Sequence, residues 1–293
     1  MVTRRGDMLL KRCIKAHNER NYHVFYELLA GLDDMQKQQL SLQESETYFY
    51  LNQGRACEIT SKQEQEDFLC LLRSLGRIGL MEDQLKTMWS ILSSILQLGN
   101  VCFTSYEDGS QELAVIVSYT EIRIVAQMLQ ISSDRLHCVI TQRVTNYLKP
   151  WHWKKAHLAS SFLISALRHQ QIVTSGFPKS QAPEDTSYDR IFSPLSVEGS
   201  IDARDSIAKA LYSVLFDWLV QQINHCLMPV EMDSSVGIVD VYGFEDLGVN
   251  SFEQLCINYA NEQLQHFFSQ AVLAQEQVND IGPNDEGVIL MER

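Results

Sequence analysis

The chain has 293 residues, of which 45% are hydrophobic, and its net charge is −13 at pH 7. This length and composition predict a soluble globular protein with a sizeable buried core. The acidic balance argues against an overall attraction to nucleic acid or to anionic membranes, because both need clustered positive charge. The most apolar run, 156–167, is shorter than the roughly 20 residues that cross a bilayer, so no membrane insertion is expected.

The seven cysteines show no C-x-x-C spacing, and an odd number cannot all pair within one chain. Buried, reduced thiols are the plain interpretation, and they place the protein in the cytoplasm.

Apolar residues at helical spacing dominate the chain. They predict helices at 21–31, 33–40, 61–76, 81–100, 119–130, 132–144 and 200–227. Gly31 suits the C-terminal stop of the first helix, and Ser61 with Glu64 has the spacing of a capping box. Asp202 and Asp205 suit the N-terminus of the last of these helices. A strand pair is predicted at 101–106 and 112–118, joined by an Asp-Gly turn.

A local inversion of charge follows. No acidic residue occurs between Arg143 and Pro183, although this stretch carries several basic residues and two tryptophans. The residues that could meet an acidic partner surface are Lys149, Trp151, Trp153, Lys154 and Lys155. His152 and His157 are five residues apart, which does not suit one helical face, so metal binding has little support here.

The stretch with the strongest chemical signal is VGIVDVYGFEDLGVNSFEQLCINYANEQLQHFF, residues 236–268. A buried strand is predicted at 237–241, with Asp240 toward its C-terminal end, where open sheets bind ligands. A carboxylate there can hold the shell of a magnesium ion, and Gly243 lets a backbone N–H approach a phosphate. On spacing alone, a cap or a turn former remains the alternative for Asp240.

A helix is predicted from Ser251, which can cap it together with Gln254. Its apolar flank continues over several turns: Phe252, Leu255, Cys256, Tyr259, Leu264, Phe267 and Phe268. From periodicity alone, this flank indicates a core helix.

These residues resemble the second nucleotide switch and relay helix of the myosin motor domain. Matching segments occur in the same order elsewhere, in NERNYHVFYELLAG, ILSSILQLGNVCF and DARDSIAKALYSVLFDWLVQQIN. Two further segments, SLQESETYFYLNQG and IFSPLSVE, are most similar to the unconventional myosins of class fifteen. The resemblance implies a mainly α fold with a few β-strands, the upper half of an incomplete motor head of the P-loop NTPase type.

The resemblance also implies residue roles. Asp240 would sit in the outer shell of magnesium, the Gly243 amide would touch the terminal phosphate of ATP, and Glu245 would form a closing ion pair with an arginine of the first switch. Phe244 belongs to the same switch. The helix from Ser251 to about residue 275 would relay switch movement, through residues that include Ser251, Phe252, Glu253, Asn258, Asn261 and Phe267.

The chain also departs from the family pattern. None of its fourteen glycines is followed by lysine, so the phosphate loop G-x-x-x-x-G-K-[ST] is absent from these residues. The first switch, converter and lever are not matched either. We therefore expect a partial motor domain at 1–277, with a divergent tail at 278–293, that does not bind ATP and magnesium alone.

A basic insertion of about 146–190 is the third departure. Three interpretations are open: an actin-contacting extension, a solvated loop without a partner, or translated sequence from an aberrant transcript. At the level of the family, the expected function is an actin-activated, ATP-dependent motor in the cytoplasm and cytoskeleton, with actin filaments and the rest of a motor head as partners. The alternative is a non-catalytic actin-binding or regulatory module.

Overall fold

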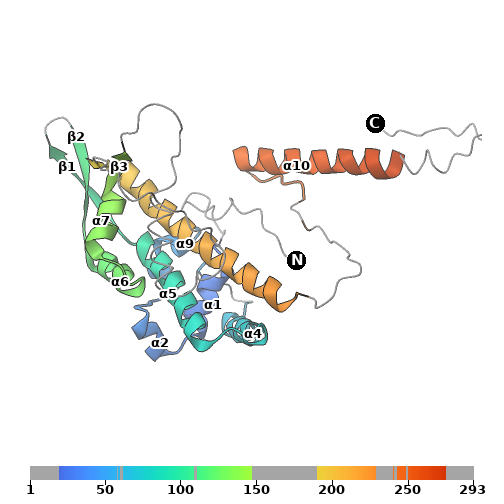
Figure 1. The fold of residues 1–293 in the computed structure, drawn as a ribbon, viewed down its shortest axis with the longest axis horizontal. Helices are drawn as coiled ribbons and strands as arrows, with labels where there is room; N and C mark the ends of the chain where they lie inside the picture. The colour runs from blue at the N-terminus through green and yellow to red at the C-terminus, as the bar shows by residue number, and fades with distance from the viewer. Residues whose placement is uncertain are drawn as a thin grey trace, which may run out of the picture. The chain divides into compact units, whose positions relative to one another are not determined.

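The structure is a computed structural model that describes residues 20–57, 59, 62–108, 111–146, 190–228, 240, 243–248 and 250–274. The chain divides into two units, 1–228 and 229–293, which are described separately. The described residues are mostly helical with few strands (Figure 1), which confirms the predicted fold class. Within them, no helix is both long enough and apolar enough to cross a membrane.

The first unit is built from helices. Their bounds are α1 His23–Gly31, α2 Asp34–Gln39, η1 Ser45–Thr47, α3 Phe49–Asn52, α4 Glu64–Arg77, α5 Glu82–Gly99, α6 Thr120–Met128, α7 Ser133–Thr141 and α9 Val197–Cys226. The central helix is α5, which packs against α6 and α9. Its second half is buried on every side, and it supplies much of the core. Burial of this kind stabilises the fold by roughly 1.5–3 kcal/mol for each large apolar side chain.

The start of α4 differs from the prediction. The helix begins at Glu64, so this residue is its first position rather than the third position of a capping box. Gln63, which precedes the helix, forms no side-chain cap. The Glu64 carboxylate is instead bonded to Arg20, 2.5 Å away. Ser61 lies outside the described residues. A capping box does form at α2, where Asp33 and Gln36 bond each other's backbone N–H groups.

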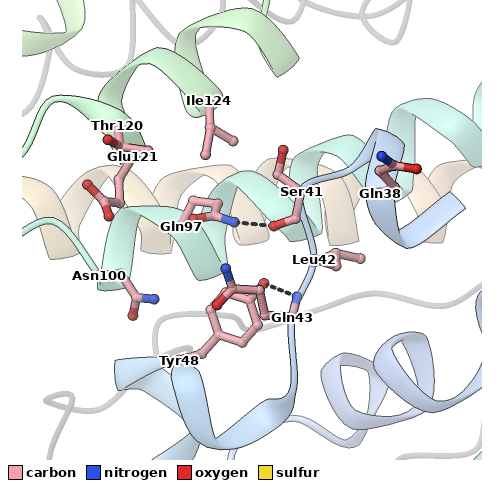
Figure 2. Close-up of a pocket in the computed structure, with 10 residues that line it drawn as sticks. All are labelled: Gln38, Ser41, Leu42, Gln43, Tyr48, Gln97, Asn100, Thr120, Glu121 and Ile124. Carbon is pink, nitrogen blue, oxygen red and sulfur yellow. Dashed lines mark hydrogen bonds between the residues drawn. The ribbon is translucent and has the colours of Figure 1, made fainter. Parts of the chain in front are cut away.

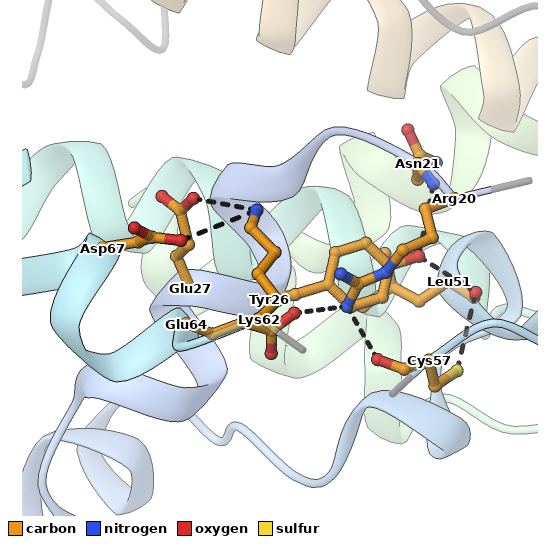
Figure 3. A network of polar contacts seen from close by, with 9 residues as sticks. All are labelled: Arg20, Asn21, Tyr26, Glu27, Leu51, Cys57, Lys62, Glu64 and Asp67. Atoms are coloured by element: carbon orange, nitrogen blue, oxygen red, sulfur yellow. Dashed lines mark hydrogen bonds and ion pairs between the residues drawn. The ribbon is translucent and has the colours of Figure 1, made fainter. Parts of the chain in front are cut away.

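A polar network fixes the segment before α1 to the loop before α4 (Figure 3). The Arg20 guanidinium donates to the Cys57 carbonyl over 2.7 Å, bonds Glu64, and stacks 3.7 Å from the centre of the Tyr26 ring. Burial raises the pKa of the Tyr26 phenol, whose hydroxyl donates to the Leu51 carbonyl. The network therefore ties four separate stretches of chain together around one cation.

The predicted hairpin is confirmed. Strands β1 (Phe103–Asp108) and β2 (Gln111–Ile116) pair antiparallel, with Phe103 opposite Ile116 and Asp108 opposite Gln111. The two turn residues between them lie outside the described part of the chain.

The prediction of one helix over 132–144 is wrong at its end. Helix α7 stops at Thr141, and β3 (Gln142–Asn146) pairs antiparallel with β4 (Arg190–Pro194). The β-branched Val144 and Thr145 favour a strand once a partner strand is available. After β4, the backbone of Leu195 bonds both Ala114 and Thr141, and this joins the start of α9 to the hairpin and to α7.

Helix α9 begins at Val197, three residues before the predicted start, and the Ser196 hydroxyl caps it by accepting from Gly199 N–H. Asp202 and Asp205 therefore lie in its second and third turns, and the predicted helix-terminus role is wrong for both. Asp205 instead accepts a 2.6 Å hydrogen bond from the Tyr50 hydroxyl and pairs with Arg204. Arg204 is 5% exposed and also donates to two carbonyls at the C-terminal end of α5, those of Gly99, its last residue, and Val101, two residues further on.

Candidate nucleotide-switch segment

The described part of the second unit consists of a loop followed by a helix. Helix α10 spans Phe252–Phe268 and continues as one stretch of π-helix, η2 (Ser269–Ala274). The predicted capping box is confirmed. The Ser251 side chain accepts from the Gln254 N–H, and the Gln254 side chain accepts from the Ser251 N–H. The helix therefore starts where the sequence predicts, α10 ends at Phe268, and helical backbone is described as far as Ala274.

The predicted phosphate-facing residues lie exposed. Asp240 and Gly243 are exposed, and the Phe244 side chain is 66% exposed. A Cβ built on Gly243 meets no atom within 4 Å, and the Gly243 backbone is not in the left-handed region. Nothing in the described residues therefore requires a glycine at position 243. The predicted strand at 237–241 lies outside the described residues except for Asp240, which is not in a strand.

Glu245 is held to α10 by its backbone. Its N–H donates to Asn258 Oδ1 and its carbonyl accepts from Asn258 Nδ2, both over 2.8 Å. One side chain thus satisfies both backbone groups of one loop residue, as a neighbouring strand would. The contact joins residues that are thirteen positions apart in sequence and anchors the loop on the second turn of the helix.

The Glu245 side chain is also bonded to α10. Gln254 Nε2 donates to Glu245 Oε2 over 3.2 Å, while Gln254 Oε1 accepts from the Ser251 N–H over 2.8 Å. Gln254 is only 2% exposed although it lies in the first turn of the helix. The capping glutamine therefore links the helix start to the carboxylate that the resemblance assigns to switch closure.

Asn250 closes the loop between Glu245 and the start of α10. Its Oδ1 accepts from the Leu247 N–H over 2.9 Å, and its Nδ2 donates to the Leu247 carbonyl over 2.8 Å. Gln254 and Asn258 therefore hold Glu245 on the helix, while Asn250 closes the loop on itself at Leu247. No cation among the described residues pairs with Glu245.

The sequence prediction missed the way in which these amides act. Gln254, Asn258 and Asn261 are spaced four and three residues apart, and this spacing puts them on one face of a helix. Asn261 Nδ2 is buried and forms no hydrogen bond with any described residue. The signal in the sequence that could have indicated their role is this row of amide side chains beside the apolar flank of the helix.

The apolar flank of α10 does not lie in a core within the described structure. The exposed fractions are 75% for Phe252, 64% for Leu255, 65% for Tyr259 and 65% for Phe267. The prediction of a core helix is therefore wrong for these residues as described. A row of large exposed apolar side chains is typical of an interaction surface.

Less is described of the other predicted site residues. The backbone of Glu253 belongs to α10, and nothing is described of its side chain. The proposed actin-contacting residues all lie outside the described part of the chain: Lys149, Trp151, Trp153, Lys154 and Lys155.

Among the described residues, no group of three or more histidine, cysteine, aspartate or glutamate side chains could hold a metal ion. Asp240 alone is too small a donor set to bind magnesium by itself.

Comparison of the amino-acid sequence with known proteins identifies a family. The family model described as myosin head (motor domain) matches residues 9–281. Unconventional myosin-XV of Homo sapiens is 44% identical over 263 residues, which are 90% of this chain and 6% of that protein. Unconventional myosin-XVB of Homo sapiens is 41% identical over 266 residues, 90% of this chain and 7% of that protein.

A more distant relative is also a myosin. Myosin-I heavy chain of Dictyostelium discoideum is 35% identical over 265 residues, 90% of this chain and 10% of that protein. The chain thus spans a tenth or less of the length of these three relatives. The match covers α1 through α10 and both predicted switch and relay segments. This chain belongs to the myosin head (motor domain) family.

Proposed function

We propose that the chain acts as part of an actin-based, ATP-dependent motor and contributes the second nucleotide switch and the relay helix of its head. The observation that carries the proposal is the amide clamp on Glu245. Asn258 holds its backbone and Gln254 holds its carboxylate, so a displacement of the loop that begins at Gly243 must move α10 or break three hydrogen bonds.

The open environment of Gly243 supports the same function. The described residues around it leave room for a side chain at this position. A glycine that packing does not require is explained by the approach of a ligand to its backbone. We assign this ligand as the terminal phosphate of ATP, with magnesium held partly by Asp240, and Phe244 moves with the same loop.

The remaining parts of the nucleotide site are assigned to other residues of a motor head. The sequence contains no G-x-x-x-x-G-K-[ST] loop to hold the outer phosphates. The chain alone therefore does not turn over ATP, and its partners are the rest of a motor head and actin filaments, in the cytoplasm and cytoskeleton. The proposed domain division is a partial motor domain at 1–277, with an insertion at about 146–190, and a divergent tail at 278–293.

A chimera tests this function. Residues 240–274 of this chain replace the matching residues of the human unconventional myosin-XV motor domain, and actin-activated phosphate release is measured. The chimera keeps the activity of the parent, and Glu245→Ala within the chimera removes most of it. An inactive but folded chimera, or a chimera that Glu245→Ala leaves unaffected, contradicts the proposal.

A second function, that of a non-catalytic actin-binding module, is favoured by the run without acidic residues between Arg143 and Pro183. Lys154 and Lys155, beside two tryptophans, carry the charge and aromatic area that would bind an acidic filament. Co-sedimentation of the chain with filamentous actin tests this function. Saturable pelleting without nucleotide that Lys154→Glu with Lys155→Glu abolishes supports the module, and absence of pelleting rules it out.

A further inference from the structure

The pocket of the first unit is small, and bonds within the protein hold its polar walls (Figure 2). Its volume is about 280 Å³, slightly below the roughly 300–1,000 Å³ of drug-sized sites. Gln97 Nε2 donates to the Ser41 carbonyl over 2.7 Å. The Tyr48 hydroxyl accepts from the Gln43 N–H over 2.9 Å. The surface that is open to a larger partner lies elsewhere in the described chain, on α10.

The outer stripe of α10 is a row of side chains on the helix face opposite to the clamp on Glu245. Its five members are all exposed: Phe252, Cys256, Tyr259, Gln263 and Phe267. At about 100° per residue they fall within roughly 80° of arc, and the clamp residues Gln254 and Asn258 lie on the other side of the helix. The loop that the clamp holds therefore leaves the stripe open.

The apolar area of the outer stripe suits one side of a protein–protein interface. Phe252, Tyr259 and Phe267 are 75%, 65% and 65% exposed. At about 150–250 Å² for a whole aromatic side chain, they present roughly 300–500 Å² together. A standard interface buries about 800 Å² per partner, of which roughly 60% is apolar. The stripe, with the exposed Leu255 beside it, therefore supplies most of the apolar area that one partner needs.

The aromatic side chains are spaced almost symmetrically about Tyr259. Phe252 lies seven residues before it and Phe267 eight residues after it, about 10.5 and 12 Å along the helix axis. A two-fold interface requires such a self-complementary surface, because residue i of one copy meets residue j of the other and the reverse. In an antiparallel pair, Phe252 of each copy meets Phe267 of the other, and the two Tyr259 rings meet at the axis.

Charge also favours the antiparallel orientation. A helix carries partial positive charge at its N-terminus and partial negative charge at its C-terminus, so antiparallel neighbours place opposite ends together. A parallel pair would instead bring Glu245 and Asp246 of both copies, which precede α10, to the same end. Like charges placed close together repel each other.

We propose that two copies of this chain form an antiparallel dimer through the outer stripe of α10. The dimer is a state of the chain by itself and does not depend on the proposed function. In this register, Cys256 of each copy lies opposite Gln263 of the other, since both pairs are centred on the same two-fold axis as Phe252 and Phe267.

Sedimentation velocity of the full chain tests the proposal. The measurement is made at 0.15 M salt, where the charge of −13 on each copy is screened beyond about 8 Å. Interfaces of standard size bind with micromolar or tighter affinity, so at about 100 µM the chain should sediment with twice its mass of 33.6 kDa.

Two matched variants locate the interface. Tyr259→Glu places two like charges at the two-fold axis and should raise the dissociation constant at least tenfold. Tyr106→Glu makes the same change at a tyrosine of β1 that is 61% exposed, and it should leave the dimer intact. Both side chains are exposed, so neither change should unfold the chain, and circular dichroism verifies this.

A disulfide reports the orientation. In a Gln263→Cys chain, mild oxidation by oxidised glutathione should join Cys256 of one copy to the introduced thiol of the other, and mass spectrometry of chymotryptic peptides identifies the link. Positions 256 and 263 of one helix are about 10 Å apart, beyond the roughly 7 Å that a disulfide can bridge, so the link forms only between copies.

Each measurement can contradict the proposal. A chain that stays monomeric at every concentration overturns the dimer and leaves the rest of a motor head as the occupant of this face. A dimer that Tyr259→Glu does not weaken, or that Tyr106→Glu weakens equally, overturns the assigned surface. A mass that grows beyond that of two copies overturns the two-fold symmetry, and a predominant link between the two Cys256 thiols overturns the antiparallel orientation.

Discussion

Replacement of Asn258 by alanine removes the clamp that joins the switch loop to α10. The two hydrogen bonds to the Glu245 backbone, each 2.8 Å long, are lost together. A typical hydrogen bond contributes about 0.5–1.5 kcal/mol net, so the loop should lose about 1–3 kcal/mol of local stability. Alanine is the better helix former, so α10 itself should not weaken.

Amide hydrogen exchange measures this local effect. A loss of about 1–3 kcal/mol corresponds to roughly 5- to 150-fold faster exchange of the Glu245 amide, if exchange occurs through local opening. Peptides from α5 and α9, in the other unit, should exchange at unchanged rates. Mass spectrometry of peptides that cover residues 243–251 separates these two regions.

Asn261→Ala is the matched control, because it makes the same replacement on the same helix face. Asn261 Nδ2 has no hydrogen-bond partner among the described residues, so this variant should leave protection at Glu245 unchanged. The reasoning is refuted if Asn258→Ala leaves exchange at Glu245 unaffected. It is equally refuted if the two variants speed exchange by the same factor, since a general change in α10 would then be the cause.

Three further predictions concern the first unit. Gly31→Ala should lower the free energy of unfolding by about 1–3 kcal/mol, because the added Cβ would lie 2.1 Å from the Phe68 ring. Gly76→Ala, a helical position without any such contact, should raise it by about 0.5–1 kcal/mol in the same urea titration. Arg204→Met should cost about 3 kcal/mol or more, since it leaves buried acceptors unpaired, and a loss below about 1 kcal/mol would contradict the assigned network. The Tyr48 phenol ionises near pH 10 when unfolded and at about 12 when folded. The free energy of unfolding should therefore be unaffected by Tyr48 below pH 10 and should fall by at most about 3 kcal/mol as the pH rises to 12. A Tyr48→Phe chain measured in parallel should lack this pH dependence.

Local signals were sufficient for much of the fold. Apolar periodicity located α5 and α9, since both helices bury long stripes against their neighbours. An Asp-Gly pair between two alternating segments located the β1–β2 hairpin. The cap of α10 was predictable because both of its partners, Ser251 and Gln254, lie within one turn.

Contacts between distant residues account for the errors. The last residues of the predicted helix at 132–144 form β3 because they pair with β4, which follows more than forty residues later. Arg20 takes Glu64 away from a local cap for the same reason. The clamp of Asn258 on Glu245 also joins separate elements, and no residue near Asn258 in sequence indicates which loop it holds. Periodicity identifies the faces of a helix but not the surfaces that they meet.

The β3–β4 pairing has a practical consequence. Asn146 and Arg190 lie opposite each other at the end of the ladder, so the chain leaves and re-enters the fold at one place. Whatever length of chain joins two such points, each doubling adds only about 0.6 kcal/mol of closure entropy. This junction is therefore a permissive site for engineering: a fluorescent protein or an affinity tag spliced between residues 146 and 190 would leave the packing of α5, α7 and α9 unchanged.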